Sequence, residues 1–182
     1  YDESLKILKN SSSEDFIMLS DNDEIPNLNS KQLINNKNSI VIFNQLFIYF
    51  KFNLLYDKMI WPGTKGCSMK KLKSLSWLRN IKLKKYPFWR LDTLFSENKY
   101  IDINVIQDGG WHFTNLKTPE EMYEKFMNFG HHDEFRLSGL TIEKIREKIK
   151  NQEMFYDHFA DKSSNNKWES DYKLKVIGDE ML

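Results

Sequence analysis

The segment from residue 39 to residue 56 commits this chain to a β-sheet. It is rich in isoleucine, phenylalanine, valine and tyrosine, and apolar and polar residues partly alternate along it. Side chains of these types pack well on a pleated, half-buried surface and therefore favour strands. We predict one long strand or two strands here, interrupted near Asn44 or near Asn53.

Shorter segments predict further strands and a set of helices. The apolar runs at residues 16–19 and 100–106 are bounded by turn residues, as is typical of buried strands. Thr118-Pro119-Glu120-Glu121 predicts a helix start, and Thr141 predicts a second one. Weaker signals predict helices at residues 2–9 and 31–34, a loop at 61–66, and strands at 67–75 and 172–177. Because helices follow strands in the second half, the predicted class is α/β.

Composition excludes several classes of protein. The 182 residues suffice for one compact domain with a hydrophobic core. A formal net charge of +1 produces no strong field for nucleic acid or for a membrane surface. No apolar run approaches the roughly 20 residues of a transmembrane segment. The single cysteine, Cys67, allows no internal disulfide, which fits a reducing, cytoplasmic location.

Asp21 and Asp23 are the sharpest candidates for chemistry. They follow the apolar run at residues 16–19, and in extended backbone residues two apart project to the same side. Two carboxylates at a strand end repel each other unless a cation joins them, and Mn²⁺ or Mg²⁺ prefers such oxygen ligands. The alternative is a solvated acidic turn. A calcium-binding EF-hand loop is excluded, because Pro26 and Gln32 stand where it needs glycine and glutamate.

Two longer blocks carry a family resemblance. They are Ser20-Asp21-Asn22-Asp23-Glu24-Ile25-Pro26 and Asp108-Gly109-Gly110-Trp111-His112-Phe113. The first resembles the Asp-x-Asp-Glu-Ile-Pro signature of family 17 of the glycosyltransferases, and the second resembles that family's Gly-Trp-His-Phe/Cys block. The family contains the β-1,4-mannosyl-glycoprotein N-acetylglucosaminyltransferases and many microbial relatives. Weaker likenesses extend the resemblance over nearly the whole chain, at residues 61–64, 89–90, 118–121 and 129–135.

The resemblance implies a GT-A-like fold and an inverting glycosyltransferase. Such an enzyme moves a sugar, here GlcNAc from UDP-GlcNAc, to a hydroxyl group of a glycan acceptor. Carried onto this sequence, Asp21 and Asp23 would hold the donor diphosphate and a Mn²⁺ or Mg²⁺ ion. His112 would be a further metal ligand or a phosphate donor, with a simply hydrogen-bonded histidine as the alternative. Trp111 would stack on a sugar ring, with a place in the core as the alternative.

Inversion requires a base that takes the proton of the acceptor hydroxyl. Asp108 is the first candidate, because it ends a predicted strand beside Gly109 and Gly110, which permit a close approach of the substrate. Glu24 and Asp133 are its rivals as the base. The alternative for Asp108 is a turn-forming residue without a catalytic role.

The chain also departs from the family pattern at its start. A GT-A fold normally places a nucleotide-binding βαβ region before the Asp-x-Asp strand, whereas 15 residues precede Phe16 here. Since the chain begins with Tyr1 rather than methionine, we expect that part of this region, and any targeting signal, is missing. Residues 1–182 would form one catalytic domain, with the metal and diphosphate segment at 1–38 and the acceptor-side segment at 39–182. Abundant lysine, asparagine and isoleucine indicate a microbial or viral relative.

Two other functions remain open at this point. A different metal-dependent enzyme that cleaves phosphoesters would use Asp21, Asp23 and a histidine. A non-catalytic carbohydrate-binding domain would contact sugar through Trp111 and Trp61. His131 and His132 are adjacent, so their side chains diverge and both cannot easily face one metal ion.

Overall fold

The computed structural model describes residues 6–37, 39–83, 86–87, 89–93, 95–96, 99–100, 102–128, 132–160, 165–178 and 180. His131 and the first four residues of the helix predicted at 2–9 lie outside these residues. The chain divides into two compact units. The first unit comprises Tyr1–Leu46 and Ile60–His112, and the second comprises Phe47–Met59 and Phe113–Leu182.

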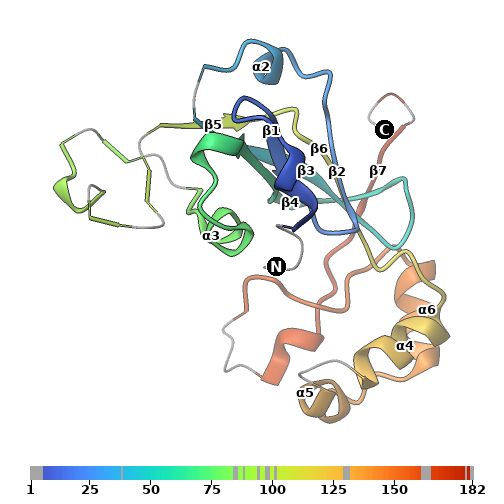
Figure 1. The fold of residues 1–182 in the computed structure, drawn as a ribbon. Helices are drawn as coiled ribbons and strands as arrows, with labels where there is room; N and C mark the ends of the chain where they lie inside the picture. The colour runs from blue at the N-terminus through green and yellow to red at the C-terminus, as the bar shows by residue number, and fades with distance from the viewer. Residues whose placement is uncertain are drawn as a thin grey trace. The chain divides into compact units, whose positions relative to one another are not determined.

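The strands of the described residues form a seven-stranded sheet. They are β1 (Phe16–Leu19), β2 (Glu24–Pro26), β3 (Ile40–Tyr49), β4 (Leu54–Ser68), β5 (Ile103–Ile106), β6 (Gly110–Thr114) and β7 (Lys175–Val176). The order is β1-β4-β3-β6-β2, while β5 also pairs with β3 and β7 with β4 (Figure 1). The β3–β5 pair is parallel, whereas β1–β4, β2–β6 and β4–β7 are antiparallel. Together with the helices, this mixed sheet confirms the α/β class.

The helices are short. They are α2 (Lys31–Ile34), α3 (Leu75–Asn80), α4 (Pro119–Met127), α5 (His132–Leu137) and α6 (Ile142–Lys150), with 3-10 helices η1 (Lys6–Asn10), η2 (Met69–Lys71), η3 (Leu91–Thr93) and η4 (Asn165–Trp168). The predicted start of α4 is confirmed, because the Thr118 hydroxyl accepts from Glu121 N–H and the Glu121 carboxylate accepts from Thr118 N–H. Thr141 caps α6 as predicted.

The long apolar segment forms β3 and the start of β4, so the prediction of two strands interrupted near Asn53 is confirmed. Residues 40–43 of β3 are fully buried on both faces, which explains why their apolar pattern alternates only partly. One face of β3 contributes Ile40 and Ile42 to a larger hydrophobic cluster, and the other face contributes Val41 and Phe43 to a smaller hydrophobic cluster. The first cluster contains Ile40, Ile42, Cys67, Trp77, Leu78, Ile81 and Ile103, and the second contains Val41, Phe43 and Ile106.

The predicted loop at residues 61–66 is wrong, because these residues lie inside β4. Two of them, Gly63 and Gly66, are glycines because side chains from neighbouring strands pack against them, and not because the chain turns there. A Cβ atom at Gly63 would lie 1.9 Å from the side-chain oxygen of Gln45, and one at Gly66 would lie 2.5 Å from the ring of Phe16. Pro62 lies outside the residues of β4 that pair with β1, which are Lys65 to Ser68, so its missing N–H removes no hydrogen bond from that pair.

The predicted strand at residues 67–75 is also wrong. β4 ends at Ser68, η2 follows, and Leu75 begins α3. The last predicted strand shortens to Lys175–Val176, and the N-terminal helix is a 3-10 helix in its described part.

The second unit has an aromatic core. α4 packs against α5 and α6 (Figure 1). Phe126 and Phe135 of these helices contact Trp168, and Phe155 stacks on the same indole with an interplanar angle of 10°. No helix in the described parts of either unit has the length and the apolar character needed to cross a membrane.

Gly110 fixes the pairing of β2 with β6. The register places Pro26 opposite Gly110 and Glu24 opposite His112. Gly110 has a φ of +101°, and a Cβ atom there would lie 2.1 Å from the carbonyl oxygen of Ile25. Any side chain at this position would therefore push the two strands apart.

We predict that Gly110→Ala destabilises the protein by about 3 kcal/mol, through left-handed backbone strain and the clash with the neighbouring strand. Gly139→Ala is the matched control, because Gly139 also has a positive φ, of +66°, but open space around it. Its expected cost is about 1 kcal/mol. Urea unfolding followed by circular dichroism measures both, and equal losses would contradict the prediction.

Candidate functional site

The Asp21–Glu24 segment is a turn rather than extended backbone. Glu24 N–H donates to the Asp21 carbonyl at 3.1 Å, and Asp21 N–H donates to Glu24 Oε2 at 3.1 Å. The prediction that Asp21 and Asp23 project together from an extended strand is therefore wrong. The physical reason is local, since Asp and Asn side chains favour turns over strands. The turn brings Asp21 and Glu24 together instead.

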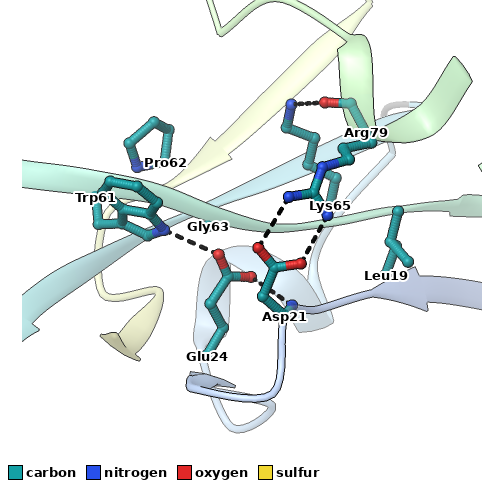
Figure 2. Close-up of a pocket in the computed structure, with 8 residues that line it drawn as sticks. All are labelled: Leu19, Asp21, Glu24, Trp61, Pro62, Gly63, Lys65 and Arg79. Atoms are coloured by element: carbon teal, nitrogen blue, oxygen red, sulfur yellow. Dashed lines mark hydrogen bonds and ion pairs between the residues drawn. The ribbon is translucent and has the colours of Figure 1, made fainter. Parts of the chain in front are cut away.

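A cavity of about 150 Å³ opens beside this turn in the first unit. Figure 2 shows the side chains of Asp21 and Glu24 directed toward groups from β4 and α3. The lining comes from β1, the turn, β4 and α3, and its residues are Leu19, Asp21, Glu24, Trp61, Pro62, Gly63, Lys65 and Arg79. Asp21 and Glu24 are thus the predicted site residues that the structure brings together in one cavity.

Glu24 is the central carboxylate of this cavity, and its side chain is 7% exposed. Its Oε1 accepts from Trp61 Nε1 at 2.8 Å, and His112 Nδ1 lies 4.0 Å from the same oxygen because His112 faces Glu24 across β2 and β6. Burial raises the pKa of Glu24 above the ordinary value for a glutamate, against the opposing effect of the hydrogen bonds from Trp61 and Asp21. The charges of Asp21 and Asp23 raise this pKa further.

Trp61 forms the aromatic wall of the cavity. Its ring lies 4.4 Å from the ring of His112, with an interplanar angle of 35°. Trp111, the tryptophan predicted to stack on a sugar, lies in β6 opposite Ile25 of β2 and does not line this cavity. A strand prediction at residues 61–65 would have placed Trp61, Gly63 and Lys65 on one side.

Two cationic side chains of the cavity were not predicted. The guanidinium of Arg79, on α3, binds Asp21 through both carboxylate oxygens, at 2.7 and 3.1 Å. Lys65 Nζ donates to the carbonyl of Ile81 at 2.8 Å and also to the carbonyl of Arg79. Burial, and next the charge of Arg79, lower the pKa of Lys65 from the ordinary value. No local sequence signal marks either residue, because only the fold brings them to the cavity that Asp21 lines.

Asp108, the first candidate for the base, does not line the cavity. Its Oδ1 accepts from the hydroxyl of Ser30 at 2.6 Å, and its carbonyl accepts from Asn27 Nδ2 at 3.1 Å. Ser30 in turn caps α2 by accepting from Gln32 N–H at 3.2 Å. Asp108 therefore supports the start of α2 through Ser30, and its role as the base stays a prediction.

The glycines beside Asp108 permit the approach of the chain's own backbone. A Cβ atom at Gly109 would lie 2.5 Å from the carbonyl oxygen of Asn44, and Gly110 meets β2 in the same way. Both glycines are buried. The space beside these glycines, which was expected to receive a substrate, is thus filled by the backbone of β2 and β3.

Asp21 and Asp23, the carboxylates predicted to hold Mn²⁺ or Mg²⁺, differ in their surroundings. Arg79 engages both oxygens of Asp21, and Asp23 does not line the cavity. Within the described ranges, no group of three or more His, Cys, Asp or Glu side chains has an arrangement that could hold a metal ion. The rival base Asp133 lies on α5 in the second unit, with Oδ1 3.3 Å from His132 Nε2. The metal-binding roles of Asp21, Asp23 and His112 stay predictions.

No family model, no curated protein and no solved structure matches this chain. The resemblance to glycosyltransferase family 17 therefore stays a prediction.

A buried hydroxyl anchors the part of β4 that forms the cavity wall. Thr64 is fully buried, and its Oγ1 lies 2.7 Å from the hydroxyl of Ser20. Gln45, also fully buried, donates to the same oxygen from Nε2 at 3.3 Å. Thr64 thus joins β4 both to the residue before Asp21 and to β3.

We predict that Thr64→Val lowers the free energy of unfolding by about 2 kcal/mol, because it leaves the buried amide of Gln45 without this acceptor. Thr64→Ser keeps the hydroxyl and loses one methyl group, so its expected cost is about 1 kcal/mol. Urea unfolding of the two variants provides the comparison. A Thr64→Val protein as stable as Thr64→Ser would show that the hydroxyl does not anchor the strand.

Proposed function

We propose that this chain carries part of the active site of an inverting glycosyltransferase with a GT-A-like fold. The enzyme moves a sugar, GlcNAc from UDP-GlcNAc, to a hydroxyl group of a glycan acceptor. One observation carries the proposal: a single cavity combines the nearly buried carboxylate of Glu24, the ring of Trp61 and two cationic side chains. A nucleotide sugar presents the three complementary features, which are a hydroxyl-bearing ring, an apolar ring face and a diphosphate.

Glu24 replaces Asp108 as our candidate for the base. A carboxylate whose pKa is raised by burial is matched to accepting a proton near neutral pH, and such groups cluster at functional sites. Trp61 Nε1 and Asp21 N–H hold both carboxylate oxygens in defined positions. Asp108 has no comparable setting, since it is exposed and bound to Ser30.

Trp61 is our candidate for the sugar contact. The C–H face of a pyranose ring packs on an aromatic face, and an indole gives a large, rigid surface for this contact. The His112 ring against Trp61 limits the orientations that the indole can take. A sugar held on Trp61 would place its hydroxyl groups close to Glu24, because Trp61 itself donates to that carboxylate.

We predict that Glu24→Gln lowers kcat for GlcNAc transfer by about 10²- to 10⁴-fold, the usual loss when a general base is removed. The variant is expected to fold with a loss of at most about 2 kcal/mol, because one of its two N–H partners loses an acceptor. UDP release from UDP-GlcNAc, with and without an acceptor glycan and with and without Mn²⁺, measures the activity.

Asp108→Asn is the matched control for this test. Asparagine keeps an oxygen that can accept from Ser30, so we expect transfer close to the native rate. Loss of transfer in Asp108→Asn with full activity in Glu24→Gln would reverse the assignment of the base. Release of phosphate from a simple phosphoester without any sugar donor would instead favour a phosphoester-cleaving enzyme. Glycan binding without any turnover would favour a carbohydrate-binding domain.

A further inference from the structure

Arg79 binds Asp21, one of the carboxylates predicted to hold a metal ion. Its guanidinium meets Asp21 in a bidentate ion pair inside the cavity lining, and the two side chains are 47% and 42% exposed. Dissolved ligands can therefore reach this pair. An ion pair this exposed contributes little net stability, because water and salt screen it. Replacing Asp21 by another oxyanion as the partner of Arg79 therefore costs little free energy.

Lys65 is a second cationic residue in the lining of the same cavity. Its Nζ donates to the carbonyl of Arg79, as Figure 2 shows, and to the carbonyl of Ile81, which connects β4 to the end of α3. Lys65 is therefore positioned by backbone carbonyls, and the guanidinium of Arg79 is positioned by Asp21. A planar guanidinium binds two phosphate oxygens at once, and an ammonium group adds a compact charge beside it.

We propose that Arg79 and Lys65 bind the diphosphate of the sugar donor directly, so that these side chains supply the positive charge predicted for a divalent metal ion. The inference rests on the proposed glycosyltransferase function and assigns the diphosphate recognition within its site. Asp21 is then a positioning residue that holds Arg79 toward the cavity until the donor arrives. The diphosphate replaces Asp21 as the partner of the guanidinium.

The charges balance through the transfer step. The acceptor oxygen forms a bond to the anomeric carbon, and the bond from that carbon to the phosphate oxygen breaks. The electron pair of the broken bond stays on the diphosphate, where Arg79 and Lys65 stabilise the developing negative charge. The proton of the acceptor hydroxyl passes to the Glu24 carboxylate.

Calorimetric titration with inorganic pyrophosphate in the presence of EDTA, at fixed ionic strength, tests the inference. The native protein is expected to bind without any metal ion. Arg79→Ala is expected to weaken binding by about tenfold or more, the usual effect of losing a charge-assisted hydrogen bond. Lys65→Met keeps the aliphatic stem and is expected to weaken binding as well.

Two further variants make the test sharper. Arg90→Ala is the matched control, because Arg90 forms a similar bidentate pair with Asp92 on η3, away from this cavity. Its pyrophosphate affinity is expected to equal that of the native protein. Asp21→Asn is expected to bind pyrophosphate severalfold more tightly, because the competing anion on Arg79 is gone. A metal-ligand role of Asp21 predicts the opposite, a loss of binding.

The inference is overturned if pyrophosphate binds only with Mn²⁺, or if Arg79→Ala binds as well as the native protein in EDTA. Parallel assays of UDP release then separate the two proposals. GlcNAc transfer that depends on Mn²⁺ would leave the glycosyltransferase in place and reject the cationic diphosphate site. Pyrophosphate binding that depends on Arg79, without transfer under any condition, would support the anion site and reject the glycosyltransferase.

Discussion

The Glu24 carboxylate, almost withdrawn from water, is the constraint on which the rest of the site depends. A buried carboxylate is costly unless hydrogen bonds compensate it, so the fold has to bring donors to both of its oxygens. Asp21 N–H comes from the turn itself, whereas Trp61 Nε1 comes from a strand 37 residues later. The turn, β2 and β4 must therefore assemble before both oxygens of the Glu24 carboxylate have hydrogen-bond donors and are shielded from water. Once they do, Asp21 is directed toward α3 and the cavity has both of its carboxylates.

Local sequence signals predicted the fold wherever a residue's neighbours in the chain decide its structure. The cap at Thr118, the strand at residues 16–19 and the break near Asn53 are of this kind. The signals failed at residues 61–66, where Trp-Pro-Gly is ordinary turn chemistry. There the strand persists because Gly63 leaves room for the Gln45 side chain and Pro62 lies outside the part of β4 that pairs with β1. Both reasons come from other strands, so no window of sequence around them contains the information.

The residues of the candidate site also divide into those that local sequence can indicate and those that only the fold brings together. Asp21 and Glu24 could be found from sequence because they follow an apolar run and lie in one short block. Lys65 and Arg79 could not, since a lone lysine and a lone arginine in charged surroundings are usually surface residues, and Arg79 lies 58 residues from Asp21. The resemblance to glycosyltransferase family 17 implies aspartate and histidine as ligands, and it does not point to Lys65 or Arg79.

The two ways of supplying positive charge make different demands on the protein. A divalent ion needs several oxygen or nitrogen ligands held at fixed distances, which a four-residue turn supplies only with help from elsewhere. An arginine needs a single carboxylate to orient it and a helix that is fixed in place. Trp77 and Leu78 fix α3 in the core, and Asp21 in the turn orients Arg79. Asp21 in this role is a ligand of the protein's own cation. The same acidic turn would then serve the transfer of a sugar without coordinating a metal, because what the departing diphosphate requires is charge at the right place.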